Sequence, residues 1–148
     1  MKLSTRSRYG LKAIVDIAAQ NPFPTTVKNI ASRQNIPQNY LEQIISLLKK
    51  AGFVKSIRGS QGGYIINCNP DSTTVGDILR TLEGSLYPVE CLSNAADNSC
   101  KTSDCKYCFT KSVWMKIHEN ISNTIDSITI SNLIDDYKKL SAMEGDFL

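Results

Sequence analysis

The pattern of apolar and polar positions predicts three helices in the first part of the chain. Apolar residues recur at intervals of three and four, the spacing of one helix face, in three segments: residues 5–20, 27–33 and 38–51. Ser4 or Thr5 can cap the first helix, and Gly52 follows the third, where glycine commonly ends a helix. Only a turn over residues 34–37 separates the second helix from the third. This order predicts a helix-turn-helix.

Two segments rich in β-branched and aromatic residues follow, 53–57 and 64–67, on either side of a glycine-containing tip at 58–63. They predict an antiparallel hairpin, and a helix-turn-helix followed by a hairpin is a winged helix. A helix expected over residues 74–82 completes this domain, which we place at residues 1–84. The tip is not a phosphate-binding loop, because no helix follows its glycines and no Gly-Lys-Ser/Thr sequence occurs there.

The second half of the chain predicts a cysteine-bearing loop and then a helical C-terminal part. Residues 85–110 lack a sustained period, residues 111–140 are expected to form two helices, and residues 141–148 a frayed tail. The first of these helices carries a narrow apolar seam: Trp114, Ile117, Ile121 and Ile125. Such a seam is typical of a helix that pairs with its twin across a dimer interface, and the alternative is packing on its own domain. The predicted fold class is mainly α with a small β-hairpin wing, a winged helix-turn-helix domain and a long dimerisation helix.

Charge is distributed unevenly along the chain. Residues 1–70 carry ten Lys or Arg side chains and two acidic ones, a balance of +8, whereas residues 71–148 carry seven and twelve, a balance of −5. A strongly basic segment favours a polyanion such as nucleic acid as its partner. The alternative is a basic surface that is merely solvated.

Composition excludes several classes of protein. Hydrophobic residues make up 41% of the 148 positions, enough for a buried core. Even the apolar stretch 11–19 is interrupted by Lys12 and Asp16, so no segment approaches the roughly 18 apolar residues of a membrane helix. No signal-peptide core follows the start, so we expect a cytoplasmic protein without membrane association. A single histidine nearly excludes Ser-His-Asp and Cys-His arrangements, so we expect no enzyme activity.

The third predicted helix begins with side chains suited to reading base edges. In a helix-turn-helix, the N-terminal residues of the second helix enter the major groove, and here these are Gln38, Asn39, Tyr40, Glu42 and Gln43. Gln and Asn can bond adenine in two places, and Glu can accept a hydrogen bond from cytosine N4. The alternative is capping and solvation of a helix start. The adjoining turn, the wing and the basic charge favour groove reading.

Other predicted DNA contacts surround this helix. Arg58 and Ser60 lie in a wing tip of small residues, which suits insertion into a narrow minor groove, where the negative potential is strongest. Lys28 and Arg8 are expected to contact phosphates, which position a protein without reading sequence. Two residues at the start of the first helix complete the predicted set: Ser4 and Thr5.

Four of the five cysteines gather within eighteen residues: Cys91, Cys100, Cys105 and Cys108. Thiols in a cytosolic chain stay reduced, so a tight cluster indicates metal ligation rather than disulfides. Thiolates are soft ligands that suit both iron–sulphur clusters and zinc. The spacing alone leaves both open, because an all-thiolate zinc site also uses four cysteines. Cys68, at the end of the wing, is interpreted as a strand residue.

Several blocks of this sequence closely resemble the IscR/NsrR/CymR family (Rrf-two type) of winged-helix repressors. They are spread over most of the chain: residues 1–11, 36–43, 54–64, 75–78 and 82–84, and Trp114. The resemblance implies a homodimer that pairs through the long helix and binds a palindromic operator in double-stranded DNA. In cluster-binding members of the family, a cysteine-rich loop holds an iron–sulphur cluster, whereas members of the CymR kind lack those cysteines.

The cysteines match the family pattern in part. Cys91 takes the place of its first cysteine and Cys108 that of its third, six residues before Trp114. Neither Cys100 nor Cys105 stands at the family's spacing for the middle one. Positions that supply further ligands in the family are basic here: Lys111, Arg8 and Lys12. A four-ligand site therefore requires Cys105 beside the other three cysteines, or an oxygen or non-protein ligand.

These observations favour a dimeric transcriptional repressor whose operator affinity depends on a 2Fe–2S or 4Fe–4S cluster that reports iron, redox or nitrosative status. One alternative is a zinc-stabilised or cluster-free repressor of the cysteine-metabolism type, controlled by a protein partner. Another is a small iron–sulphur electron-transfer protein. That protein would have no affinity for duplex DNA, and the basic first half of the chain argues against it.

Overall fold

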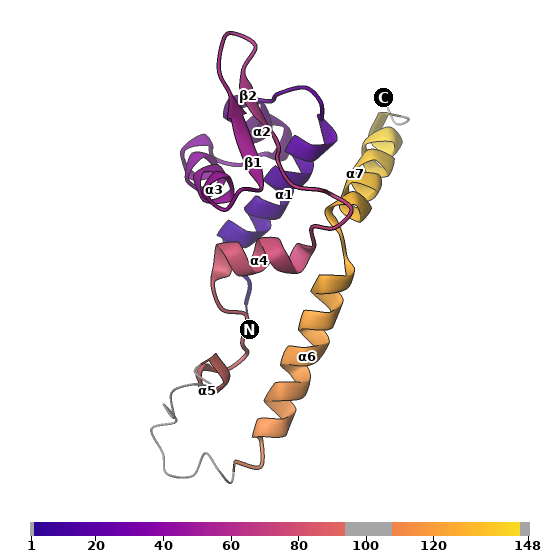
Figure 1. Ribbon diagram of the computed structural model, residues 1–148. Helices are drawn as coiled ribbons and strands as arrows, with labels where there is room; N and C mark the ends of the chain where they lie inside the picture. Colours follow the sequence, from indigo (N-terminus) through magenta and orange to yellow (C-terminus); the bar gives the residue numbers. More distant parts are fainter. Residues whose placement is uncertain (1, 94–107, 146–148) are drawn as a thin grey trace.

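The computed structural model describes residues 2–93 and 108–145 and confirms a mainly helical fold with one small hairpin (Figure 1). Its elements follow one another in this order: α1 (Thr5–Ala19), α2 (Val27–Gln34), α3 (Gln38–Lys50), β1 (Val54–Ile57), β2 (Gly63–Ile66), α4 (Val75–Glu83), α5 (Glu90–Ser93), α6 (Lys111–Ser127) and α7 (Ile130–Gly145). The helix-turn-helix and the wing are confirmed. The short helix α5 lies where the sequence predicts only a loop.

Local signals set the ends of the first helices. The Ser4 hydroxyl accepts a hydrogen bond from the Ser7 N–H at the start of α1, and the Thr26 hydroxyl accepts one from the Asn29 N–H at the start of α2. Asn35 ends α2 in a left-handed conformation with φ 52°, which Asn tolerates better than most residues. The turn between α2 and α3 is therefore specified by the residues within it.

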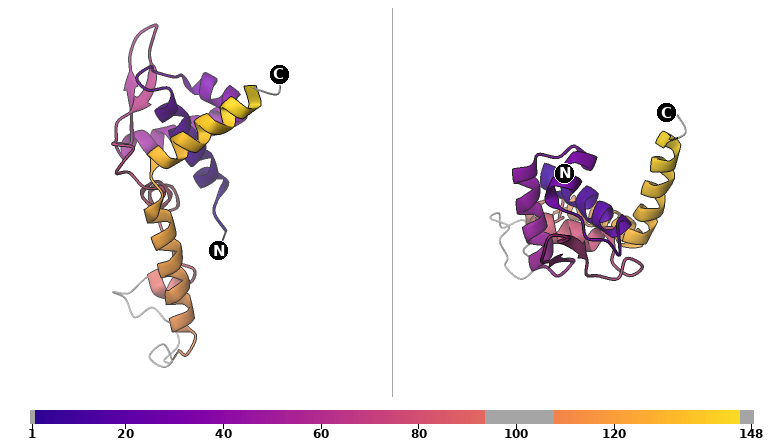
Figure 2. Two further views of the ribbon diagram at one scale, coloured as in Figure 1. Left: turned by 90° about the vertical axis from the view of Figure 1, so that its right-hand side faces the viewer. Right: turned by 90° about the horizontal axis from the view of Figure 1, so that it is seen from above.

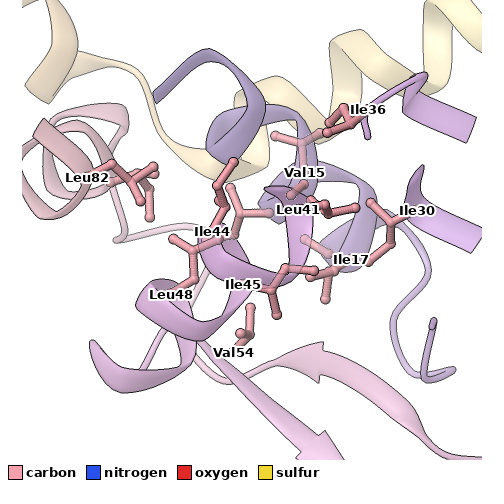
Figure 3. Close-up of a cluster of buried hydrophobic side chains, with 14 of the residues drawn as sticks. Val15, Ile17, Ile30, Ile36, Leu41, Ile44, Ile45, Leu48, Val54 and Leu82 are labelled. Carbon is pink, nitrogen blue, oxygen red and sulfur yellow. The ribbon is translucent and has the colours of Figure 1, made fainter. Parts of the chain in front are cut away.

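One hydrophobic core joins α1, α2 and α3 (Figure 3). The inner face of α3 is fully buried and consists of four residues at helical spacing: Leu41, Ile44, Ile45 and Leu48. Ile30 of α2, Ile17 of α1 and Leu82 of α4 pack against the same core. Because all apolar residues at the start of α3 point inward, its outer face remains available for a ligand.

The wing is anchored to the loop between α1 and α2. Strands β1 and β2 pair antiparallel, with Val54 opposite Ile66. Near the tip end of the hairpin, the backbones of Thr25 and Tyr64 exchange two hydrogen bonds, of 3.0 Å and 2.8 Å. A Cβ on Gly63 would lie 2.6 Å from the Thr25 carbonyl oxygen, so only glycine allows this close approach of strand and loop.

Helix α6 extends away from the winged domain, and α7 turns back along it (Figures 1 and 2). Ile130 at the start of α7 is fully buried in the core. Contrary to the frayed tail expected from residue 141, α7 continues past Leu140 to Gly145. Residues 142–144 are Ala, Met and Glu, which are strong helix formers, and no glycine or proline precedes Gly145 in this helix.

A buried carboxylate ties α1 to α2. Asp16 is 0% exposed and accepts hydrogen bonds from Arg33 Nε at 3.0 Å, Arg33 Nη2 at 2.5 Å and Gln34 Nε2 at 2.8 Å. The hydrogen bond to Asp16 raises the pKa of the Arg33 guanidinium above its ordinary value. Gln34 Nε2 also donates to the Tyr137 hydroxyl at 3.3 Å, which brings α7 into the same network. A charge in this position is tolerable only because it is paired.

Arg33→Ala should lower the free energy of unfolding by roughly 2–4 kcal/mol, because it leaves the Asp16 carboxylate buried without its cation. Arg80→Ala is the matched control. It breaks an ion pair with Asp126 in which the two side chains are 40% and 43% exposed. We expect that loss to stay below about 1 kcal/mol. Guanidinium denaturation at pH 7 measures both variants, and equal losses would contradict a special role for the buried pair.

Candidate nucleic-acid interface and cysteine segment

The first turns of α3 present a polar face to solvent. Four of the five predicted base-reading side chains are exposed: Gln38, Asn39, Glu42 and Gln43. Gln38 Nε2 donates to Glu42 Oε1 at 3.5 Å, one helical turn further on. Tyr40 differs from the other four, because it is half-buried and its ring packs edge-on against Tyr9 of α1 at 5.9 Å between centroids. Tyr40 therefore ties the start of α3 to α1.

The predicted phosphate and minor-groove contacts are also on the surface. Arg58 and Ser60 are exposed in the wing turn, and Lys28 is exposed in the first turn of α2. Arg8 is exposed on α1, and its Nη2 donates to the Thr5 hydroxyl at 3.3 Å. In Figure 1, α3 and the hairpin lie on the opposite side of α1 from α7, so the C-terminal helix leaves this face uncovered.

Ser4 is already engaged within the molecule. Its N–H donates to Glu83 Oε1 of α4 at 2.7 Å, and its hydroxyl caps α1. Burial of the Glu83 carboxylate opposes ionisation, but hydrogen bonding at the start of α1 and the positive charge of Arg6 together outweigh it and hold the pKa of Glu83 below its ordinary value. Sequence reasoning did not single out Glu83 for this task. The only available signal was its place in the block 82–84 of the family resemblance.

The structure describes two of the four clustered cysteines, and both are exposed. Cys91 lies in α5, and Cys108 precedes α6. The predicted ligands Cys100 and Cys105 lie outside the described residues. A hydrogen bond between the Cys108 thiol and the Thr110 hydroxyl, 3.2 Å apart, lowers the pKa of Cys108 and so favours the thiolate, which is the form that binds metals. Within residues 2–93 and 108–145, no three His, Cys, Asp or Glu side chains gather into a metal site.

A polar cavity connects α4 to α6 beside this segment. It has a volume of about 460 Å³ and is lined by Arg80, Gly84, Ser85, Leu86, Tyr87, His118 and Ser122. The Tyr87 ring stacks on the His118 ring at 4.3 Å. The guanidinium of Arg80 donates to both carboxylate oxygens of Asp126, at 2.7 Å and 2.8 Å. The chain that leads to Cys91 is thus held against α6 by an aromatic stack and a neighbouring ion pair.

The predicted dimer seam on α6 divides into two parts. Ile125 packs against Val75, Leu79 and Leu86 of its own chain. Together with Ile121, Leu3, Leu79 and Leu86, it also lines an apolar groove of about 270 Å³. Trp114 is half-buried, and Ile117 is 36% exposed. Near these two, Val113 and Met115 are 51% and 44% exposed. The start of α6 therefore keeps an apolar surface that the described part of the chain leaves uncovered.

A helix-turn-helix with an exposed polar first turn, a hairpin wing and a basic N-terminal half together define a winged-helix DNA-binding protein. No helix in the described ranges is both long and apolar enough to cross a membrane. Residues 3–136 match the family Rrf2, described as an iron-dependent transcriptional regulator. The chain belongs to this family of transcriptional regulators, whose members are DNA-binding proteins and not enzymes.

The chain is similar to regulators of two kinds. It is 40% identical over 134 residues to the regulator CymR of Bacillus subtilis (strain 168), and the alignment covers 90% of this chain and 89% of CymR. It is 33% identical over 146 residues to IscR of Vibrio campbellii, and the alignment covers 95% of this chain and 81% of IscR.

Solved structures of both kinds superpose on this fold. The structure of CymR, the global cysteine regulator of B. subtilis, gives a TM-score of 0.74 at 38% identity and covers 91% of this chain and 97% of that one. The structure of T. potens IscR gives a TM-score of 0.74 at 40% identity and covers 95% and 90%. The likeness therefore extends over the winged domain and the C-terminal helices.

Proposed function

We propose that this protein is a cytoplasmic, homodimeric repressor that binds a palindromic operator, and that a cluster held by its cysteines changes its affinity for that operator. The proposal depends above all on the first part of α3, where the polar face is exposed and the opposite, apolar face is buried. This face has the chemistry of base recognition, and nothing in the described part of the chain covers it.

The DNA contacts fall into three groups. Side chains at the start of α3 read base edges in the major groove, where amide and carboxylate groups match adenine and cytosine. Arg58 and Ser60 of the wing enter the minor groove, where a cation is favoured. Lys28, Arg8 and Thr5 hold phosphates and set the register of the protein on the duplex.

The uncovered start of α6 supports assembly into a dimer. Ile117 and Val113, one turn apart on the same face of α6, would otherwise remain in water. A second copy of α6 related by a two-fold axis would cover them. Two recognition helices would then meet two half-sites about 34 Å apart, one turn of DNA. A palindromic operator is the sequence counterpart of that symmetry.

The cysteine segment has the donor set for an iron–sulphur cluster. Cys91 and Cys108 stand at its two ends, both exposed, and the environment of Cys108 favours a thiolate. Together with Cys100 and Cys105 they offer four soft ligands. A bound cluster would supply a redox-sensitive cross-link between the ends of this segment. Side-chain contacts of α4 connect this segment to the DNA-binding domain. Arg80 of α4 bonds to Asp126 of α6, and Glu83 of α4 accepts the N–H of Ser4 at the start of α1.

Similarity to CymR favours a second candidate. At 40% identity to CymR, the chain also fits a cluster-free or zinc-stabilised repressor that a protein partner controls. Both candidates use the same DNA-binding surface. They differ in the metal content of the purified protein and in whether that metal changes DNA affinity.

Glu42→Ala should change base preference at particular operator positions, by about 1–3 kcal/mol each, because a base-edge acceptor is lost. Lys28→Ala should weaken binding to all sequences alike and reduce the slope of log affinity against log salt by about one unit. Binding to a duplex library at several salt concentrations distinguishes the two effects. Uniform loss from both substitutions would reject the assignment.

Ile117→Asp should convert the dimer into a folded monomer, because the charge would have to be desolvated at the interface. In the separate chain this residue is 36% exposed, so the fold itself should tolerate the charge. Asn123→Asp, an exposed position on the same helix, is the matched control and should stay dimeric. Sedimentation and circular dichroism measure assembly and folding. A dimeric Ile117→Asp variant would place the interface elsewhere.

Protein purified without oxygen should contain iron and acid-labile sulphide and absorb in the visible range, whereas the second candidate predicts zinc or no metal. Cys105→Ser should weaken or alter that absorbance, since a hydroxyl replaces a soft thiolate. Cys68→Ser, outside the clustered segment, should not. Removal of the cluster should change affinity for one and the same duplex by at least about five-fold. Equal affinities with and without it would end the sensor hypothesis.

A further inference from the structure

One continuous chain of polar contacts links the helix-turn-helix to the wing. Asp16 of α1 accepts from Arg33 of α2 through both Nε and Nη2, at 3.0 Å and 2.5 Å. Nη2 of Arg33 also donates to the Thr25 hydroxyl at 2.6 Å. The backbone of Thr25 in turn forms the two-hydrogen-bond bridge to Tyr64 in β2. Asp16 is 0% exposed and Thr25 4% exposed, so water competes weakly for these bonds.

The two ends of this chain hold the two parts of the molecule that meet DNA. Arg33 lies in the last turn of α2, directly before the turn that leads into α3. Thr25 pairs with Tyr64 near the tip end of the hairpin, next to the Ile57–Gly63 pair that precedes Arg58. Gly63 lets the strand backbone approach the Thr25 backbone without an intervening side chain. The base of the wing is joined directly to the end of α3, where the Phe53 N–H donates to the Leu48 carbonyl. The position of Thr25 relative to Arg33 therefore constrains the tip end of the wing relative to α3.

The bridge lies close to the wing tip. Tyr64 is one residue from Gly63, whose pairing with Ile57 directly precedes Arg58. Two residues of strand span about 7 Å, so a shift of the bridge is passed on directly to Arg58. A shift of about 1 Å is enough to break a hydrogen bond.

We propose that the Asp16–Arg33–Thr25 chain fixes the reach of the wing from the recognition helix, and that Thr25 and Arg33 are positioning residues for the minor-groove contact of Arg58. The inference rests on the proposed function, because it assumes that α3 and the wing bind one duplex together. Beyond that function, the inference names the residues that set the distance between the major-groove contacts of α3 and the minor-groove contact of the wing.

The test is a double-mutant cycle between Thr25→Val and Arg58→Ala. Valine keeps the shape of threonine but removes the oxygen that accepts from Arg33. The Arg33 side chain is 34% exposed, so water can satisfy the freed N–H group and the fold should persist. Thr25→Ser retains the hydroxyl and serves as the rescue variant. Thr73→Val makes the same change at another buried threonine, 8% exposed and just before α4.

Affinities are measured on a duplex that the wild-type protein enriches from a random library. Thr25→Val should lower affinity about five-fold, the effect of one lost hydrogen bond, and Thr25→Ser and Thr73→Val should change it less than about two-fold. In the Arg58→Ala background, Thr25→Val should have almost no further effect, because the contact that it positions is already gone. Hydroxyl-radical footprints should lose the same minor-groove protection in Thr25→Val and in Arg58→Ala.

The possible failures are distinguishable. If Thr25→Val and Arg58→Ala weaken binding additively, or if Thr73→Val weakens it as much as Thr25→Val does, the hydroxyl serves stability alone and the positioning role is overturned. DNA reading by α3 and the wing would then still stand. If the wild-type protein enriches no duplex, or if Arg58→Ala leaves affinity and footprint unchanged, the proposed wing contact fails and the positioning role fails with it.

Discussion

The arrangement of the DNA-binding elements depends on the paired charge of Asp16. A carboxylate without access to water must find cationic or N–H donors in the protein, and here both come from the end of α2. This requirement places the last turn of α2 against the last turn of α1. The turn to α3 starts from that point, so the recognition helix takes its position from a polar contact as much as from the apolar core.

Helix α4 connects the winged domain to the C-terminal part of the chain. At its end, Glu83 accepts the N–H of Ser4 at the start of α1. A Cβ on Gly10 of α1 would overlap the Leu82 side chain, so the two helices cross closely. On the other side, Arg80 forms a bidentate pair with Asp126 of α6. A movement of α6 relative to the domain would therefore have to alter contacts that also hold the start of α1.

Most elements of the fold could be predicted because their signals are local. The caps at Ser4 and Thr26 and the left-handed Asn35 act over three or four residues, and the inward face of α3 is visible as a spacing. The exposed polar start of α3 follows from the same pattern. The extension of α7 was missed because a short run without clear apolar spacing resembles a tail, although its residues favour helix.

The sequence by itself determined which segments become helices and hairpin, and which face of each is apolar, because these depend on neighbours within a turn or two. Only the tertiary structure decided the partners of the polar groups. Asp16 meets Arg33 across 17 positions, Ser4 meets Glu83 across 79, and Gln34 meets Tyr137 across 103. It also decided that Ile125 packs against α4 of its own chain while the described residues leave Ile117 36% exposed. Such pairings depend on how helices cross, and the apolar period along one helix carries no information about its partner.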